Sequence, residues 1–325
     1  MAFERERMKR STADLAASGV FIGTSSWKYP GWNGMLYEEA RYLWHGKFAK
    51  SRFEKNCLGE YAEVFKTVCV DAAYYTFPSL TYLEGLAAQV PADFQFGFKV
   101  TDEITLKKYP NLPRFGQRAG QPNEHFLQAE VFERAFLQPC ASIRSRVGIL
   151  ILEFSRFFPA DYEHGRQFVA DLDSFLAKLP PGWPYAIEMR NKHWLEQEYF
   201  DCLARHGVTH VYNSWTEMPP VGEQMALPGS QTNPALIAAR FLLKPGRTYE
   251  NAVKSFEPYE KTKEVNEEAR QAGARLIQEG KKTVNRKTFI FVNNRLEGNA
   301  LQTIHAMLEA AAPLRGEKSP NNFAH

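Results

Sequence analysis

Four side chains with different chemistry lie within seven residues of one another near the middle of the chain, in the stretch PYAIEMRNKHW. Glu188, Arg190, His193 and Trp194 supply a carboxylate, a guanidinium, an imidazole and an indole. Residues 185–189 read as a short buried strand, and Glu188 and Arg190 have the same parity, so both side chains leave the same face at its end. Opposite charges at the end of a buried strand predict a binding or catalytic site.

Eight short apolar runs alternate with amphipathic segments along the chain, which is the pattern of βα units around a parallel sheet. They are spaced roughly 25 to 50 residues apart, as a (β/α)₈ barrel with insertions allows. A chain of 325 residues with 44% hydrophobic content can fill one such core. We therefore expect an α/β protein, a single-domain irregular TIM-type (β/α)₈ barrel, with strands at 20–23, 67–70, 94–98, 147–152, 185–189, 209–212, 236–243 and 288–292.

Capping residues and stripes of apolar side chains predict several helix boundaries. Ser79 is expected to cap a helix over 80–90, and Asp161 is expected to cap a helix that carries the apolar stripe 168–179. A long charged helix is expected over 257–282. These helices would cover the outside of the sheet.

The composition also bounds the domain limits and the cellular setting. We place the barrel at residues 19–314, after a charged extension at 1–18 and before a disordered tail at 315–325. The extension lacks the apolar core of a signal peptide, and no later window resembles a membrane span. The scattered cysteines support neither disulfides nor a structural zinc site. We expect a soluble cytoplasmic protein that does not bind membranes; its cysteines are Cys57, Cys69, Cys140 and Cys202.

Strand parity predicts which side chains line the barrel. On the third strand the phenylalanines should face the helices, which leaves Lys99 at the end of the lumen. In such barrels the catalytic groups come from the C-terminal ends of the strands and from the loops that follow. The other polar side chains expected at the same mouth are Glu153, Glu188, Arg190, Arg240, and Asn293 or Asn294.

This convergence of charge has two interpretations, and the sequence leaves both open. In the first, the cations neutralise Glu153 and Glu188 in a structural network, because buried charges need partners. In the second, Glu188, Glu153 and Lys99 are catalytic, with the carboxylates as general acid and base, while Arg190 and Arg240 hold an anionic substrate. The function would then be that of a hydrolase or lyase.

A metal site at the mouth is disfavoured. Asp71, Glu153, Glu188 and His193 all lie near strand ends, but a two- or three-metal hydrolase of this architecture would need more histidines there. We assign no metal ligand, and we keep Asp71 and His193 as candidate ligand-binding residues. The chain also lacks a P-loop, an HExxH motif, a Gly-X-Ser-X-Gly elbow and a Rossmann fingerprint, so no motif identifies a nucleotide cofactor.

Two loops add candidate binding residues. After the first strand, Trp27, Tyr29 and Trp32 are expected either to stack on a planar or sugar-like ligand or to cap the barrel mouth. After the third strand, a loop carries four cations and one acid, which favours an anion or a solvated surface. The charged residues of that loop are Lys107, Lys108, Arg114, Arg118 and Glu124.

Six blocks of the sequence, in order, resemble those of the YecE-like family, also called domain of unknown function 72. They are IGTSSWKYPGW, FKTVCVDAAYYTFP, FQFGFKVTDEIT, VGILILEF, YAIEMRNKHW and FIFVNNRLEGNA, and the resemblance covers residues 20–308. It implies a TIM-type barrel whose biochemical role is largely unestablished. Cys69, Asp71 and Glu153 stand where the family usually has Glu, Asn and Gln. The residues that match the family pattern are Lys99, Glu188, Arg190, Trp194, Arg240 and Asn294.

Three classes of function follow from these observations. We favour an enzyme or binding protein for a small anionic ligand that carries phosphate or carboxylate, held at the C-terminal mouth. A nucleic-acid phosphodiesterase or repair-type protein is the alternative, although a net charge of +3 is well below that of a dedicated nucleic-acid binder. A non-enzymatic interaction scaffold is the third class. The sequence does not determine the oligomeric state.

Overall fold

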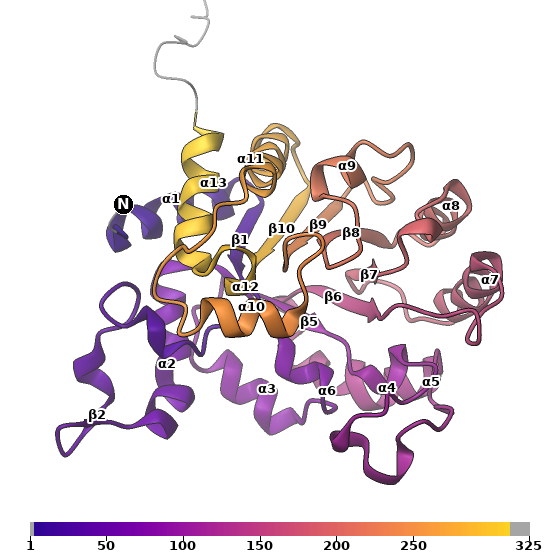
Figure 1. Cartoon of the computed structure of the whole chain (residues 1–325), viewed down its shortest axis with the longest axis horizontal. Helices are drawn as coiled ribbons and strands as arrows, with labels where there is room; N and C mark the ends of the chain where they lie inside the picture. The colour runs from indigo at the N-terminus through magenta and orange to yellow at the C-terminus, as the bar shows by residue number, and fades with distance from the viewer. Residues whose placement is uncertain (1–2, 313–325) are drawn as a thin grey trace, which may run out of the picture.

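A computed structural model describes residues 3–312, and eight parallel strands close into a barrel at its centre (Figure 1). The strand order around the barrel is β1-β10-β9-β8-β7-β6-β5-β4. This confirms the α/β TIM-type fold, and each predicted strand is present with its ends displaced by at most two residues. The strands are β1 (Val20–Thr24), β4 (Thr67–Val70), β5 (Gln95–Lys99), β6 (Val147–Phe154), β7 (Tyr185–Met189), β8 (Thr209–Ser214), β9 (Leu236–Phe241) and β10 (Lys287–Val292).

Helices surround the barrel, and a short hairpin, β2 (Leu43–Trp44) with β3 (Lys47–Phe48), projects from the β1–α2 connection (Figure 1). Within residues 3–312 no helix is long and apolar enough to cross a membrane. The longer helices are α1 (Arg5–Ala17), α2 (Lys50–Val64), α3 (Leu80–Ala87), α7 (Gly165–Leu176), α8 (Gln197–Arg205), α10 (Tyr249–Phe256), α11 (Glu267–Lys282) and α13 (Ala300–Ala311). The shorter ones are α4 (Asp102–Thr105), α5 (Ala129–Phe132), α6 (Gln138–Cys140), α9 (Val221–Met225) and α12 (Asn294–Glu297).

Helix α1 occupies most of the segment that the sequence analysis treats as a charged extension. Its buried residues Met8, Thr12 and Leu15 face the barrel, and α1 packs against β1 and α2. An ion pair between Arg7 and Glu309 joins α1 to α13. The charged residues of this segment are therefore the outer face of a packed helix. The tail expected at 315–325 lies outside the described residues.

Of the predicted helix boundaries, one is confirmed and two are wrong. Ser79 caps α3, since its side chain accepts a hydrogen bond from the backbone N–H of Tyr82. Asp161 does not cap α7, because its carboxylate accepts from the N–H of Phe158 and the helix begins only at Gly165. The long helix over 257–282 is also wrong. Pro258 cannot continue a helix from α10, and α11 starts only after its own cap, Asn266.

The barrel interior is apolar directly below the mouth. Phe94, Phe96 and Phe98 face the helices, as parity predicts, and the lumen is filled from the opposite faces of the strands. Gly97 makes room there, because a Cβ at this position would lie 2.5 Å from the ring of Phe291. The lumen residues are Phe21, Cys69, Ile149, Ile151, Ala186, Val211, Leu236, Ala238, Phe289 and Phe291. A polar site at the mouth must therefore lie above this layer, at the C-terminal ends of the strands.

Candidate functional site

A cluster of charged side chains lies directly above the apolar layer of the lumen. Lys99 ends β5, Glu153 lies near the end of β6, Glu188 is on β7, Arg190 follows β7 and Arg240 is on β9. The structure thus brings together the charged residues that parity placed at the mouth. Asp71, at the first position after β4, joins them.

Arg240 is the centre of this cluster because its guanidinium reaches three carboxylates. One terminal nitrogen donates to Glu153 Oε2 at 3.0 Å and to Glu188 Oε2 at 2.6 Å. The other terminal nitrogen donates to Asp71 Oδ1 at 3.3 Å. Arg240 therefore connects β9 to the ends of β4, β6 and β7 across the barrel.

Arg190 and Lys99 complete the pairing of the two glutamates. Arg190 Nη2 lies 2.6 Å from Glu153 Oε2 and 3.1 Å from Glu188 Oε1, and Lys99 Nζ lies 2.8 Å from Glu153 Oε2. One oxygen of Glu153 thus faces three cations. We call the following six residues the mouth cluster, in which three acids balance three cations: Asp71, Lys99, Glu153, Glu188, Arg190 and Arg240.

Exposure divides the mouth cluster into an inner and an outer part. Glu188, Glu153 and Arg240 are almost fully buried, whereas the side chain of Asp71 is 30% exposed. The inner pairs are charge-assisted hydrogen bonds between buried groups, where removal of either partner is costly. Asp71 is the member that faces solvent.

The charges also fix the protonation state of Glu153. Burial raises the pKa of its carboxyl, but the charges of Arg190, Lys99 and Arg240 more than reverse this effect and hold the pKa well below its usual range. Glu153 therefore stays ionised near neutral pH. This state suits it to hold cations in place, and makes it a poor general acid.

Aromatic side chains pack against two of the cations. Lys99 Nζ lies 3.5 Å from the centre of the Tyr74 ring, and the Arg190 guanidinium lies 3.8 Å from that of Trp215. Tyr75 follows Tyr74 and is 61% exposed. Sequence reasoning missed all three aromatic residues. The block DAAYYTFP directly after β4, and Trp215 directly after β8, were the available signals.

The aromatic residues that the sequence analysis placed in the first loop have a different role. Trp27 and Trp32 are buried in the hydrophobic core, and Tyr29 packs against Trp32 and Tyr259. Core packing leaves Trp27 and Trp32 no open face for a ligand. For Trp27 and Trp32 this burial favours the capping interpretation over stacking on a ligand.

The two asparagines after β10 are backbone caps. Asn293 accepts a hydrogen bond from the N–H of Arg295 at the start of α12. Asn294 accepts one from the N–H of Ala300 at the start of α13. Their oxygens fix the turn between β10 and α13, so a structural role accounts for both positions.

His193 and Trp194 lie beside the mouth cluster. Trp194 stacks on Phe157 and Phe168 with ring centres 5.5 and 5.6 Å apart, which is core-like packing. His193 is exposed, and together with Arg190 it lines a cavity of about 230 Å³. Arg190 therefore belongs both to the mouth cluster and to the wall of a cavity.

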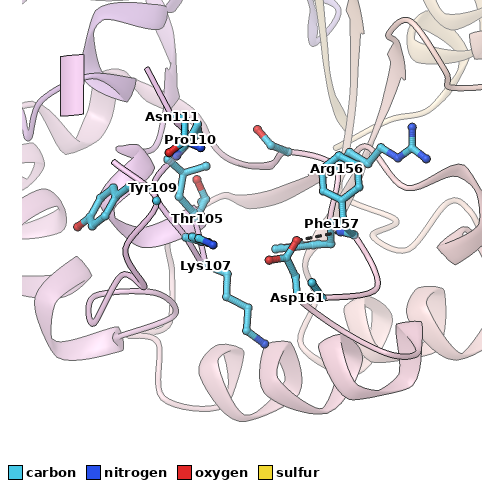
Figure 2. A pocket seen from close by; sticks show the side chains of 14 residues that line it. Thr105, Lys107, Tyr109, Pro110, Asn111, Arg156, Phe157 and Asp161 are labelled. Atoms are coloured by element: carbon cyan, nitrogen blue, oxygen red, sulfur yellow. Dashed lines mark hydrogen bonds between the residues drawn. The ribbon is translucent and has the colours of Figure 1, made fainter. Parts of the chain in front are cut away.

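The basic loop after β5 carries less unpaired charge than its sequence suggests. Arg114 lies 2.7 Å from Asp102 Oδ2, and Arg118 pairs with Glu103. Lys107 and Lys108 instead line a second cavity, of about 340 Å³, between residues 105–111 and 155–161 (Figure 2). The loop is thus partly a folded, internally neutralised structure.

Potential metal ligands come together away from the mouth. Asp173, Cys202 and His206 place one ligand atom each within 4.8 Å of one another, at the packed helices α7 and α8. Asp173 Oδ1 already accepts from His206 Nε2 at 2.8 Å and from Arg205 at 2.9 Å, so hydrogen bonds and an ion pair account for this group. At the mouth, the carboxylates of Asp71, Glu153 and Glu188 are engaged by guanidinium and ammonium groups.

Comparison with solved structures supports the fold. A DUF72 family protein from Enterococcus faecalis V583 is similar over 94% of this chain and 100% of its own, with 18% identity and a TM-score of 0.61. A DUF72 family protein from Thermotoga maritima MSB8 is similar over 90% of this chain and 97% of its own, with 22% identity and a TM-score of 0.55.

Comparison by sequence identifies the family. Among curated proteins, none matches the chain. The family model described as "Protein of unknown function DUF72" matches residues 21–322. Because this match spans most of the chain, the protein belongs to the DUF72 family, whose function is unknown.

Proposed function

We propose that the mouth cluster binds the anionic group, a phosphate or a carboxylate, of a small ligand. The observation that carries this proposal is the position of Asp71. It is the most exposed acid of the cluster, and at 3.3 Å it forms the longest ion pair with Arg240. An incoming anion that displaces the Asp71 carboxylate from Arg240 would meet the other five members, which are three cations and two acids, and would balance their charge.

The cluster is also built to hold its cations in place for such a ligand. Glu188 and Glu153 fix Arg190 and Arg240 from below, and aromatic rings flank Lys99 and Arg190. Cations held in fixed positions lose little conformational entropy when an anion binds. Planar guanidinium groups also suit the geometry of phosphate and carboxylate.

The nucleic-acid alternative has less support. The basic loop after β5 could contact a phosphate backbone, but its Arg114 and Arg118 are already paired with Asp102 and Glu103. Binding of a short oligonucleotide that weakens steeply with salt would nevertheless favour this alternative over the small-anion proposal.

The test is the thermal stability of Asp71→Asn in the presence of inorganic phosphate, sulfate and acetate, against sodium chloride at the same ionic strength. The substitution removes the competing charge, so we expect phosphate to bind at least about tenfold more tightly than to wild type, a gain of about 1.4 kcal/mol. Asp93→Asn is the matched control, because Asp93 is 64% exposed and pairs with Lys66 away from the mouth. An equal effect of both substitutions, or no effect of either, contradicts the proposal.

A further inference from the structure

One of the cavities near the mouth, which we call the Phe158 cavity, lies between two loops at the C-terminal ends of the strands. Residues 105–111 form one wall and residues 155–161 form the other (Figure 2). The second loop begins two residues after Glu153 of the mouth cluster. The volume of about 340 Å³ is within the range of small-molecule sites.

The first wall is held by side chains from outside the cavity. Asn123 Nδ2 donates to the backbone carbonyls of Glu103 at 2.8 Å and of Leu106 at 2.7 Å. The hydroxyl of Tyr109 lies 2.7 Å from the Glu103 carboxylate. These bonds fix the path of the chain on both sides of Lys107.

The second wall is held in the same way. The side chain of Asn191 accepts from the N–H of Phe157 and donates to its carbonyl, both at 2.9 Å. Asp161 Oδ2 accepts from the N–H of Phe158 at 2.9 Å (Figure 2). Both walls are therefore preformed, which lowers the entropic cost of binding a ligand between them.

The lining combines an apolar surface with positive charge. Phe157 is buried in its wall and Phe158 is 56% exposed at its edge, whereas the Tyr109 side chain points away from the cavity (Figure 2). Lys107 and Lys108 also line it, and in the part of the chain that the structure describes neither forms an ion pair with a carboxylate. The Lys107 ammonium lies 3.3 Å from the centre of the Tyr162 ring, so the cavity combines the aromatic side chains of Phe157 and Phe158 with the positive charge of two nearby lysines.

Phe158 also borders the cavity that Arg190 lines. Arg156, Phe157 and Phe158 line both cavities, on the two sides of the loop 155–161. Arg156 pairs with Glu217, and its guanidinium lies 5.3 Å from the Phe158 ring. Phe158 is therefore placed between a space that reaches the mouth cluster and a space lined by two lysines.

We infer that Phe158 stacks on a planar ring of the ligand, so that the ligand is an aromatic or heteroaromatic acid and not a simple inorganic or aliphatic anion. This inference rests on the proposed function, because it places the acid group at the mouth cluster by way of Arg190. Stacking on an exposed aromatic face typically strengthens binding severalfold or more. Stacking on Phe158 requires a planar ring in the ligand, and the cations of the mouth cluster require the ligand to be negatively charged.

The experiment compares the affinities of inorganic phosphate and phenyl phosphate by isothermal titration calorimetry on the full chain. For wild type we expect phenyl phosphate to bind at least about tenfold more tightly than phosphate. In Phe158→Ala this ratio should fall to within about twofold, while Phe158→Tyr should keep it. Trp44→Ala is the matched control, because Trp44 is an exposed aromatic residue on the β2–β3 hairpin, on the other side of the molecule in Figure 1.

Each outcome separates the two proposals. If phosphate binds but the phenyl ring adds no affinity, or adds the same affinity in Phe158→Ala, the inference is overturned and the proposed function stands. If neither compound binds to wild type or to Asp71→Asn, both are overturned. Loss of the ratio in Trp44→Ala as well would show an effect on the whole fold, and would also overturn the role of Phe158.

Discussion

Glu188→Gln is the substitution that best separates a structural from a functional role for the inner part of the mouth cluster. Glu188 is completely buried and bridges two guanidinium groups, accepting from Arg190 at 3.1 and 3.2 Å and from Arg240 at 2.6 Å. Glutamine has nearly the same size, so a packing defect does not complicate the result. It removes the charge, however, and turns an N–H₂ group toward one of the two guanidiniums.

The expected loss of stability is about 3 kcal/mol, the lower end of the range for removing one partner of a buried ion pair, because Glu153 still faces both arginines. The 325 residues of the chain imply an unfolding entropy of about 0.7 kcal/mol/K, so the melting temperature should fall by about 4 to 5 °C. Differential scanning calorimetry without any ligand measures this change.

Two comparisons make this prediction specific. Glu124→Gln is the matched control, since Glu124 is 91% exposed, and it should change stability by less than about 0.5 kcal/mol. Adding Arg190→Met to Glu188→Gln should recover part of the loss, because the uncompensated cation is removed. A melting temperature of Glu188→Gln within about 1 °C of wild type would refute this reasoning, and would mean that the mouth is wet and that Glu188 is free to serve a ligand.

Three further predictions concern other parts of the fold. Gly97→Ala should lower the free energy of unfolding in urea by about 1 to 3 kcal/mol, because its Cβ would meet the Phe291 ring. Gly85→Ala, in open space on α3, should instead raise it by about 0.5 to 1 kcal/mol. Equal effects of the two substitutions would contradict the packing described for the lumen. Burial lowers the pKa of His210 to about 3, so the imidazole binds a proton less readily in the folded state than in the unfolded state. The stability that the neutral His210 contributes is therefore complete above about pH 6.5 and is lost as the pH falls below that value. From pH 7 to 5.5 wild type should lose on the order of 1 kcal/mol more than His210→Gln, and parallel pH profiles of the two would argue against a buried neutral imidazole. All four cysteines are buried, and burial raises the pKa of Cys57 and Cys140 to about 12, so a thiol reagent at pH 8 should react quickly only after denaturation; rapid labelling of the native protein would contradict this.

The sequence predicts the barrel well because its signals are local. Each strand is a short apolar run, and the parity of β5 follows from three phenylalanines at alternate positions. Once the fold is known, parity alone places Lys99, Glu153, Glu188 and Arg240 at one mouth. Only identities and spacing are needed for this step.

Other features depend on contacts between distant parts of the chain. Asp71 and Arg240 are 169 positions apart, and parity does not predict that the arginine reaches across the lumen to this acid. The burial of Trp27 and Trp32 likewise depends on how the first loop folds back on the barrel. The predicted start of α7 was wrong for a local reason, because the Asp161 carboxylate accepts a hydrogen bond from the backbone N–H of Phe158 and not from the first turn of the helix.

The position of Arg240 in the chain also determines when the mouth can become neutral during synthesis. The protein is made from its N-terminus, so the other five members of the mouth cluster are complete before Arg240 is added. Until β9 joins the sheet, these five residues carry one unbalanced negative charge at the end of an open barrel. The same strand that supplies the missing cation is needed, with β10, to close the sheet. Neutralisation of the mouth therefore needs β9 and closure of the barrel needs β10 as well, so a chain that ends before β9 exposes both an open sheet edge and an unbalanced acid.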